Sequence, residues 1–458
     1  MSSRRLPVLN IHMFNIESFC GEVWSQIEIG PTGDYKICCL ANFNNDYGMA
    51  HDKDGKVMNV LTHSIEEAIN SETHKEHRRQ LRDNIKVKRC RNCYDSEEST
   101  KGLDGWGNEH SKKYGRSKRQ RVLAGTTQQI PEYVSWATAD QYTSEDGTTT
   151  SKVVNLDLRF GNLCNQKCIM CNPEFSSLWY DDHAALFGED KPIKIGDNKT
   201  YKLEKDSRGK YELNYTKWWE SPIWWERLDS IAPSLRHIYF TGGEPLLVPA
   251  MQEIMDKLIA GGYAKDIILR FDTNLSAINK KVIDKFKHFK KIHLCVSVDD
   301  VEERYELIRY PGNYNNLLSN IQKLIDNNIE IHYISCCIGV ASIYSMVRVI
   351  DLAERLGVTA EFRFLEGPWH LDIRSLPKSA KQEIIDFYKN LPGDANRQKW
   401  YTAITRLLTK YMETERIDRL TKFVSIMDKL DKLRGTDWRT TLPDVCDILR
   451  RHCPETGA

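Results

Sequence analysis

From residue 153 onward, short apolar segments alternate with longer segments in which apolar residues recur every three or four positions. The short segments are typical of buried strands and the longer ones of amphipathic helices. Repeated β–α units of this kind predict an α/β fold with a parallel sheet, either open or curled into a partial barrel, with functional residues at the C-terminal ends of the strands. We expect strands at 153–160, 237–241, 266–273, 291–298, 330–338 and 360–365, and helices at 251–259, 279–288, 316–327 and 347–356.

The remaining regions differ from this pattern and from one another. The N-terminal region contains short strand-like segments and a helix whose start carries Ser64 and Glu67, the spacing of a capping box. The segment after it is polar and charged, and the end of the chain has the apolar period of helices. We therefore predict a small N-terminal α+β domain at 1–95, a polar linker at 96–152, an α/β domain at 153–370 and a helical C-terminal extension at 371–458.

The charge balance and the hydropathy exclude several classes of protein. Lys and Arg number 65 against 64 Asp and Glu, which is unlike the basic excess of an electrostatic nucleic-acid binder. No apolar run approaches the ~18 residues that span a bilayer, and no apolar signal segment follows Arg4 and Arg5. We therefore expect a cytoplasmic protein that binds neither nucleic acid nor a membrane.

Three of the 13 cysteines form the most informative motif. Cys164, Cys168 and Cys171 follow the first predicted strand of the α/β domain with Cys-x3-Cys-x2-Cys spacing. In a reducing cytosol such closely spaced cysteines ligate metal more often than they form disulfides, and thiolates select zinc or iron–sulfur species. Because the loop supplies only three ligands, an iron–sulfur cubane would keep one iron open, as catalytic metal sites do. A zinc site would need a fourth ligand, for which only His183 lies nearby.

A second motif, Tyr239-Phe-Thr-Gly-Gly-Glu-Pro245, ends the next predicted strand. Two adjacent glycines let a ligand approach the backbone closely and leave backbone groups free to pair with a polar small molecule. Glu244 adds a carboxylate suited to an ammonium group. The motif alone is compatible with an ordinary turn, but one strand after the three-cysteine loop it is specific.

Together the two motifs resemble the radical S-adenosylmethionine (radical SAM) superfamily over roughly residues 153–366. The resemblance implies a partial (β/α)6 barrel in which the three cysteines hold a [4Fe–4S] cluster and its fourth iron chelates S-adenosylmethionine (SAM). Reductive cleavage of SAM gives a 5′-deoxyadenosyl radical that abstracts a substrate hydrogen. One departure is Met170, where the family usually has an aromatic residue. The residues that match the family motif for the amino end of SAM are Gly242, Gly243, Glu244 and Pro245.

Weaker matches lie at the following strand ends and on the next helix. The resemblance implies that SAM is contacted by Asn274, Ser297, Asp299 and Arg309. Strand alternation adds one inference, because Cys295 faces the barrel interior if Ser297 does. Cys295 is then a candidate hydrogen-atom donor to a substrate radical, with a small buried core residue as the alternative interpretation.

Four N-terminal cysteines form a second constellation. Cys20 and Cys38 flank a predicted two-stranded hairpin with Gly33 at its turn, and Cys90 and Cys93 form a Cys-x2-Cys motif after the predicted helix. Four thiolates close a metal site, which suits either a structural zinc ion or an electron-transfer cluster.

The Cys-x12-Gly-x4-Cys spacing resembles the twitch half of the SPASM domain, which carries one auxiliary [4Fe–4S] cluster. The glycine spacing favours Cys38 over its neighbour Cys39. Two features depart from the family: the domain precedes the barrel instead of following it, and Ser99 occupies a position expected for a ligand of a second auxiliary cluster. We therefore expect one auxiliary cluster, with the ligands Cys20, Cys38, Cys90 and Cys93.

The resemblance implies a radical SAM oxidoreductase that modifies a peptide side chain by oxidation or cross-linking, with the auxiliary cluster taking part in electron transfer. Its partners would be the substrate and a one-electron reductant such as a flavodoxin or ferredoxin. Two alternatives stay open. One is the radical oxidation or rearrangement of a small molecule such as an aminosugar or nucleotide, and the other is a non-catalytic metal-binding protein that binds a partner.

Overall fold

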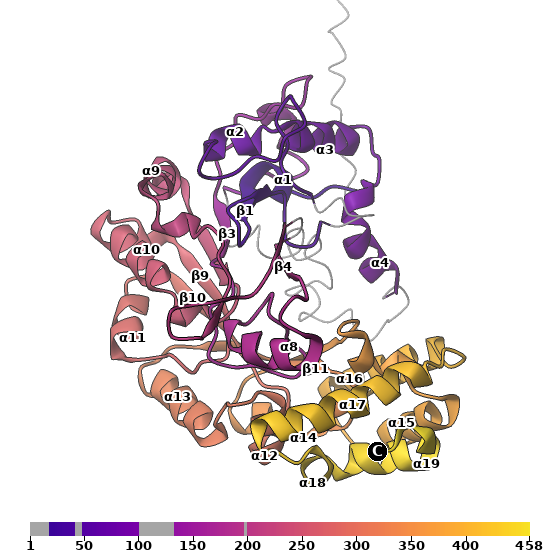
Figure 1. The fold of residues 1–458 in the computed structure, drawn as a ribbon. Coiled ribbons are helices and arrows are strands. Elements are labelled where there is room, and N and C mark those ends of the chain that lie inside the picture. Colours follow the sequence, from indigo (N-terminus) through magenta and orange to yellow (C-terminus); the bar gives the residue numbers. More distant parts are fainter. Residues whose placement is uncertain (1–17, 42–47, 100–131, 197–198) are drawn as a thin grey trace, which may run out of the picture. The chain divides into compact units, whose positions relative to one another are not determined.

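In the computed structural model, the described residues are 18–41, 48–99, 132–196 and 199–458. The chain forms two compact units, which are described separately (Figure 1). The chain passes between them three times: within strand β3 (Asn155–Arg159), between Lys217 and Trp218, and within strand β8 (His237–Thr241). Of the predicted linker, residues 100–131 lie outside the described ranges. Unit 1 comprises residues 1–158 and 218–238, and unit 2 comprises residues 159–217 and 239–458.

Unit 1 contains three paired strands and several short helices. Strand β1 (Gln26–Ile29) pairs antiparallel with β2 (Tyr35–Lys36) and parallel with β3. The predicted capping box is confirmed, because Ser64 accepts a hydrogen bond from the Glu67 backbone and the Glu67 side chain accepts one from the Ser64 backbone. The helices are α1 (Glu22–Ser25), α2 (Ile65–Ile69), α3 (Glu72–Arg82), α4 (Arg91–Ser99) and α9 (Pro222–Ile231).

Tryptophan side chains fill much of the core of unit 1. Trp24, Trp218 and Trp224 are fully buried, and the rings of Trp218 and Trp224 meet edge to face with their centroids 4.9 Å apart. Trp218 Nε1 donates a hydrogen bond to the Gly30 carbonyl oxygen at 3.0 Å, so the polar atom of this ring is satisfied. This packing ties the segment before α9 to the turn between β1 and β2.

Unit 2 contains the repeated β–α pattern, and the strands and helices predicted for it are confirmed to within a few residues. Its strands lie in the order β8–β9–β10–β11–β12, with parallel pairing from β9 to β12. The strands are β9 (Ile268–Thr273), β10 (Lys291–Ser297), β11 (Ile331–Ile338) and β12 (Ala360–Phe364). The helices are α10 (Pro249–Ala260), α11 (Lys280–Phe286), α12 (Glu302–Ile308), α13 (Tyr314–Asp326) and α14 (Ser345–Arg355).

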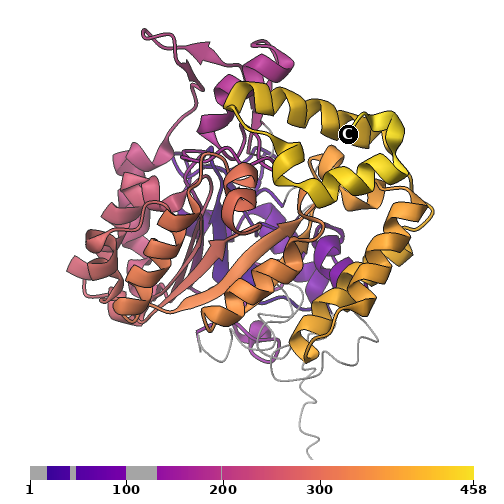
Figure 2. The same cartoon turned by 90° about the horizontal axis from the view of Figure 1, so that it is seen from below.

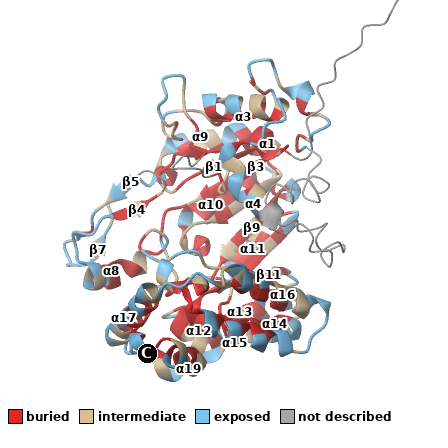
Figure 3. Ribbon diagram, turned by 90° about the vertical axis from the view of Figure 1, so that its right-hand side faces the viewer, coloured by how far each residue is buried: buried red, intermediate tan, exposed pale blue. Residues whose placement is uncertain are grey.

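The two faces of this sheet differ in polarity. On the face covered by helices, Phe271 stacks with Phe240 at a centroid distance of 5.1 Å and meets the tilted ring of Phe286 of α11 at 5.3 Å. Helices α13 and α14 have buried residues on one side and exposed residues on the other (Figure 3). Along β8 and β9, partly exposed residues alternate with buried ones, so the opposite face of the sheet carries side chains that solvent reaches.

The C-terminal extension is helical, as predicted, and its helices group beside the strands of unit 2 (Figure 2). Helix α17 ends at Gly435, whose φ of +68° is the left-handed conformation that favours glycine after a helix. None of the described helices is long and apolar enough to cross a membrane. The extension comprises α15 (Lys378–Asn390), α16 (Ala395–Lys410), α17 (Ile417–Arg434), α18 (Trp438–Thr441) and α19 (Pro443–His452).

The long first crossover of unit 2 carries its own small elements. Helix α8 (Tyr180–Phe187) is followed by two short hairpins. Ile193 and Ile195 pack with Tyr180 in a small apolar cluster. The hairpin strands are β4 (Ile193–Ile195), β5 (Lys199–Tyr201), β6 (Glu204–Lys205) and β7 (Tyr211–Glu212).

A buried arginine joins several segments of unit 1. Arg78, on α3, is fully buried. Its guanidinium donates hydrogen bonds to the carbonyl oxygens of Val23 at 2.8 Å and Gly147 at 2.9 Å, and to that of Ile69. Segments far apart in the sequence therefore depend on one cation, since each carbonyl would otherwise be buried without this donor.

We predict that Arg78→Met lowers the free energy of unfolding by about 3 kcal/mol, because several buried carbonyl oxygens lose their donor at once. Lys53→Met, at an exposed turn of the same unit, should change this free energy by less than about 0.5 kcal/mol. Urea denaturation followed by tryptophan fluorescence measures both variants. Equal stability of the two would show that Arg78 is replaceable.

Candidate functional site

The three-cysteine loop follows β3 and lies in unit 2. Cys168 is buried, and Cys164 and Cys171 are partly buried. A hydrogen bond with the Cys171 thiol lowers the pKa of Cys168, whereas burial raises the pKa of Cys164 to about 12. Thiols this close together cannot all ionise without a compensating cation, and a soft metal centre supplies one. The structure therefore brings the three predicted ligands together in surroundings that fit an iron–sulfur cluster.

Main-chain and side-chain hydrogen bonds hold this loop. The Lys167 backbone N–H donates to the Tyr310 carbonyl oxygen at 2.6 Å, and Trp179 Nε1 donates to the Cys168 carbonyl oxygen at 2.9 Å. His183, the histidine considered as a zinc ligand, lies 3.4 Å from the Lys191 carbonyl oxygen through Nε2. The loop backbone is thus fixed by the segments that follow α12 and precede α8.

A buried carboxylate joins the loop to the C-terminal extension. Asp182, on α8, accepts hydrogen bonds from Lys167 Nζ at 2.7 Å and from Arg434 Nε of α17 at 2.8 Å. The Arg434 guanidinium also lies over the rings of Trp179 and Tyr310, 4.9 and 5.3 Å from their centroids. Helix α17 therefore helps to position the cysteine loop, a role that sequence reasoning missed.

The two glycines at the end of β8 pack directly on the backbone of this loop. A Cβ atom on Gly243 would lie 2.3 Å from the Leu163 carbonyl oxygen, and one on Gly242 would lie 3.0 Å from the Gly161 carbonyl oxygen. Gly242 also has a φ of +123°, which side chains rarely adopt. The Glu244 backbone N–H donates to the Leu163 carbonyl oxygen at 2.8 Å. Glycine is therefore required here by the approach of two backbones.

The Glu244 side chain holds the end of the neighbouring strand. It is 1% exposed, and its carboxylate accepts hydrogen bonds from Thr273 Oγ1 at 2.7 Å, from the Asn274 backbone N–H at 2.6 Å and from the Leu246 backbone N–H at 3.1 Å. Burial raises the pKa of Glu244 to about 7. The carboxylate thus positions the Thr273–Asn274 turn, and its contact with an ammonium group stays a prediction.

Asn274 connects this turn back to the cysteine loop. Its Nδ2 donates to Asn165 Oδ1 at 3.1 Å and lies 3.9 Å from Cys164 Sγ. A cavity of about 190 Å³ lies beside these side chains, and most of its lining is amide or hydroxyl. The residues that line it include Asn165, Gln166, Asn274, Ser276 and Tyr305.

The end of β10 carries the next group of predicted residues. Asp299 is fully buried and pairs with Arg309 at 2.7 Å between Oδ2 and Nε, and its Oδ1 accepts from the Cys337 backbone N–H at 2.7 Å. Arg309 Nη1 lies 3.9 Å from Cys168 Sγ. Ser297 pairs in register with Ser335 of β11. Of the predicted SAM contacts, Glu244, Asn274 and Arg309 therefore lie against the same cysteine loop.

Cys295 lies in a polar network that sequence reasoning did not foresee. It is fully buried, it sits in register between Asp272 and Tyr333, and burial raises its pKa to about 12. Asp272 accepts a hydrogen bond from the Tyr239 hydroxyl, and Arg270 donates to the Tyr333 hydroxyl at 3.0 Å. The sequence did carry a sign of this network: Arg270 and Asp272 occupy alternate positions of an otherwise apolar strand and therefore point to the same face.

The four predicted N-terminal ligands gather in unit 1. Burial raises the pKa of Cys20 well above its usual value, and Glu22 and the thiols of Cys90, Cys38 and Cys93 add to this rise. Cys38 and Cys90 pack against the apolar cluster that contains Phe19 and Trp24. Four thiols in shared, largely buried surroundings fit a closed metal site, and this donor set suits an iron–sulfur cluster or zinc.

Cys39 lies in different surroundings from Cys38. Its sulfur and the carboxylates of Glu28 and Asp157 each have an atom within 4.8 Å of the others. Glu28 and Asp157 are register partners on β1 and β3. Cys38, rather than Cys39, is thus the member of the pair that interacts with Cys20.

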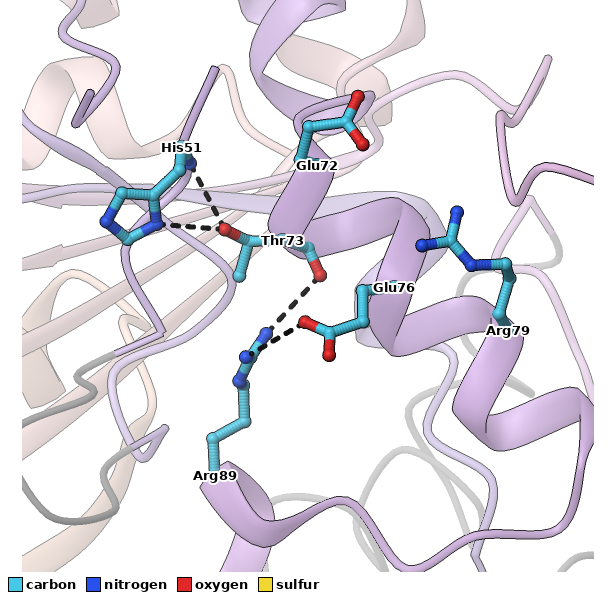
Figure 4. A pocket seen from close by; sticks show the side chains of 6 residues that line it. All are labelled: His51, Glu72, Thr73, Glu76, Arg79 and Arg89. Atoms are coloured by element: carbon cyan, nitrogen blue, oxygen red, sulfur yellow. Dashed lines mark hydrogen bonds and ion pairs between the residues drawn. The ribbon is translucent and has the colours of Figure 1, made fainter. Parts of the chain in front are cut away.

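Helix α3 supports the turn that carries Cys90. His77 Nε2 lies 3.4 Å from Cys90 Sγ. Arg89 donates to the Thr73 carbonyl oxygen at 3.3 Å and pairs with Glu76 at 3.4 Å, and these three residues are among those that line an open hollow of about 410 Å³ (Figure 4). Because the Arg89 and Glu76 charges pair with each other, we assign the hollow a structural role in holding Cys90.

Comparison with known proteins finds a family match for the region of each cysteine set. Residues 158–353 match the model of the radical SAM superfamily, and residues 20–94 match that of the SPASM iron–sulfur cluster-binding domain. No curated protein matches the chain.

Several solved structures are similar to parts of the chain. anSMEcpe with bound AdoMet is 16% identical, with a TM-score of 0.34, over 52% of this chain and 61% of that chain. SuiB from Streptococcus suis is 10% identical, with a TM-score of 0.35, over 69% of this chain and 62% of that chain. TYW1 with a lysine–pyruvate adduct is 14% identical, with a TM-score of 0.26, over 59% of this chain and 85% of that chain. The chain spans about three-fifths of the length of the first two.

These family matches confirm the predicted cofactors and fold class. A radical SAM domain implies SAM and a [4Fe–4S] cluster, and a SPASM domain implies an auxiliary iron–sulfur cluster. The fold is α/β, with a partial (β/α)6 barrel, a small N-terminal α+β twitch-like domain and a helical C-terminal extension. Residues 158–353 therefore form a radical SAM domain, and residues 20–94 form an iron–sulfur cluster-binding domain of the SPASM type.

Proposed function

We propose that this protein is a radical SAM oxidoreductase that modifies a peptide side chain by oxidation or cross-linking. The observation that carries the proposal is the presence of two thiol sets in one chain, three in unit 2 and four in unit 1. Cys164, Cys168 and Cys171 would hold the cluster that, with SAM and one electron from a reductant, would supply methionine and a 5′-deoxyadenosyl radical able to abstract a substrate hydrogen. The three-cysteine set leaves a coordination position for SAM, whereas the four-cysteine set is closed and suits electron transfer.

The strand ends of unit 2 supply the proposed SAM contacts. Asp299 fixes the Arg309 guanidinium beside Cys168, which suits recognition of the SAM carboxylate. Thr273 Oγ1 and the Asn274 backbone N–H both donate to the Glu244 carboxylate, so this group is oriented before SAM binds. The cluster ligands are Cys164, Cys168 and Cys171, and the further contacts are Gly242, Gly243, Pro245, Asn274 and Ser297.

Cys295 is the proposed hydrogen-atom donor of a redox-neutral outcome, in which the substrate radical takes the thiol hydrogen instead of passing an electron to the auxiliary cluster. The thiyl radical that this leaves on Cys295 would then take one electron from the reductant and one proton. The Cys295 pKa of about 12 means that the thiol keeps its hydrogen at neutral pH, which hydrogen donation requires. Tyr333 and Asp272 lie beside it in register, so the thiol is fixed among polar groups. Its position on β10 is two residues before Ser297, on the same face of the strand.

The proposed auxiliary cluster site consists of Cys20, Cys38, Cys90 and Cys93. A cluster there would take the electron that remains on the substrate after hydrogen abstraction, and this makes the net reaction an oxidation. The proposed partners are a peptide substrate and a one-electron reductant such as a flavodoxin or ferredoxin, and the proposed compartment is the cytoplasm.

We predict that the anaerobically reconstituted, dithionite-reduced protein forms 5′-deoxyadenosine from SAM and that Cys164→Ala reduces this to the protein-free background. The reason is that the variant loses one of the three ligands of the proposed cluster. Chromatography of the nucleoside products measures the rate. Cys446→Ala, at a buried thiol of α19, is the matched control and should retain activity. A wild-type protein that never forms 5′-deoxyadenosine would contradict the proposed function.

Metal analysis distinguishes an iron–sulfur cluster from a zinc ion at the N-terminal site. We predict about eight irons per reconstituted chain, because two cubanes contain this number, and about four in the variant Cys90→Ala/Cys93→Ala. Iron, acid-labile sulfide and zinc are counted in the same sample. About four irons plus one zinc in the wild-type protein would assign a structural metal to unit 1 and remove its electron-transfer role.

The pKa of Glu244 predicts how SAM affinity depends on pH. If the carboxylate binds the SAM ammonium group, only its ionised form does so, and affinity rises as pH passes upward through about 7. We predict about a 10-fold rise in the wild-type affinity relative to that of Glu244→Gln between pH 6 and pH 8. Equilibrium dialysis with labelled SAM measures both affinities. The same pH profile in both proteins would limit Glu244 to positioning the Thr273–Asn274 turn.

A further inference from the structure

One face of the unit 2 sheet carries a cluster of charged and hydroxyl side chains, which we call the polar face. Its position follows from strand alternation, since Phe240 and Phe271 point to the helices and their neighbours along the strands point to the opposite side. The polar face consists of Tyr239, Arg270, Asp272, Tyr333 and Arg363.

Most of the polar face is satisfied by internal contacts. Asp272 accepts a hydrogen bond from the Tyr239 hydroxyl and lies 3.5 Å from Arg270. Arg270 also donates to the Tyr333 hydroxyl at 3.0 Å and lies over the Tyr239 ring, 4.7 Å from its centroid. Burial raises the pKa of Tyr333, so this hydroxyl stays neutral and adds no negative charge. The single carboxylate of the cluster is therefore already shared by Arg270 and Tyr239.

A β-bulge contributes to this arrangement. Cys295 and Leu294 are adjacent on β10, but their register partners on β11 are Tyr333 and Ile331, so His332 is an extra residue. Bulges of this kind redirect side chains and recur next to functional sites. The bulge places Tyr333 beside Cys295, where its hydroxyl meets Arg270.

Arg363 is the second cation of the polar face, and it lacks a carboxylate of its own. It is exposed on β12, and its guanidinium is attracted electrostatically by Tyr333, Asp272 and Tyr239 and repelled by Arg270. In the described part of the chain, the Arg363 side chain makes no hydrogen bond or ion pair within 4.0 Å, and none joins it to Glu361, two residues earlier on the same strand. Arg270 Nε is also buried without a hydrogen-bond partner in the described part of the chain.

The position of Arg363 connects it with the proposed SAM site. Its register partner on β11 is Cys337, whose backbone N–H donates to Asp299 Oδ1 at 2.7 Å. Asp299 in turn pairs with Arg309, and Arg309 lies 3.9 Å from Cys168. A group bound by Arg363 would therefore lie at β12, next to strand β11, whose Cys337 backbone contacts the proposed SAM residue Asp299.

We propose that Arg363, with Arg270 beside it, binds a carboxylate of the substrate, so that the substrate is a peptide with an acidic group next to the modified position. A guanidinium presents a planar fork of donors that matches both oxygens of a carboxylate. The attraction is strong on a partly desolvated protein surface with an excess of positive charge. This inference rests on the proposed function, since it names the substrate class of the same site.

The test measures binding of defined peptide probes to the reconstituted, SAM-bound holoenzyme. The probes are a blocked glycine pentapeptide with one central glutamate, the same peptide with glutamine, and an unblocked glycine pentapeptide with a free C-terminal carboxylate. We expect the wild-type protein to bind at least one of the two acidic peptides about 10-fold more tightly than the glutamine peptide. Which acidic peptide binds identifies a side-chain or a C-terminal carboxylate as the source.

Variants assign this preference to Arg363. Arg363→Gln should abolish the preference, and Arg363→Lys should restore part of it because the charge returns without the fork. Arg208→Gln, at an exposed turn, is the matched control and should keep the full preference. The iron content of each variant, measured in the same samples, shows whether it has folded and loaded its clusters.

Three outcomes would overturn the proposal: equal or undetectable binding of all peptides by the wild-type protein, a preference that survives in Arg363→Gln, or Arg363-dependent binding of inorganic phosphate without an acidic-peptide preference. The last would indicate a phosphorylated small molecule. Formation of 5′-deoxyadenosine by the wild-type protein without peptide is measured separately. If 5′-deoxyadenosine forms but no peptide preference is found, only the carboxylate site is refuted. If no 5′-deoxyadenosine forms, the proposed function is refuted.

Discussion

The cysteine loop of unit 2 and the end of β8 are in direct backbone contact, and this contact limits which residues both segments can carry. The Leu163 carbonyl oxygen accepts the Glu244 backbone N–H at 2.8 Å and would lie 2.3 Å from any Cβ atom on Gly243. A larger residue at Gly243 would push the loop away and separate Cys164 from Asn274. The Gly-Gly-Glu motif is therefore required first by packing within the chain, and its contact with a cosubstrate is built on that packing.

Buried charges extend this arrangement to regions far away in the sequence. Asp182 accepts hydrogen bonds from Lys167 of the loop and from Arg434 of α17. Asp299 forms an ion pair with Arg309, the residue that follows α12. Removing one partner of such a pair leaves an uncompensated charge in a region of low dielectric constant, which costs several kcal/mol. The C-terminal extension is thus part of the support of the cysteine loop, because Asp182 would lose one of its two cations without α17.

Local patterns predicted the parts of the molecule that depend on local interactions. The strands of unit 2 follow from runs of apolar residues, the helix end at Gly435 follows from one glycine, and the ligand sets follow from short cysteine spacings. The glycine spacing favoured Cys38 over Cys39, and the fold gives the physical reason: Cys38 interacts with Cys20, whereas the neighbouring Cys39 lies beside Glu28 and Asp157. The Asp182–Arg434 pair joins residues 252 positions apart, and no local pattern carries such information.

The two thiol sets have separate supports, and this bears on how the proposed reaction could be divided within the chain. In unit 2, the loop depends on Asp182 and on the end of β8, whereas in unit 1 the Cys90 turn depends on His77 and Arg89 of its own unit. Each of the supporting residues named here belongs to the same unit as the thiols that it supports. An open three-thiolate site generates a reactive species, and a closed four-thiolate site is suited to accept an electron. Because the named supports of each thiol set lie in its own unit, substitutions in one unit would, under the proposed function, change radical generation or electron acceptance separately.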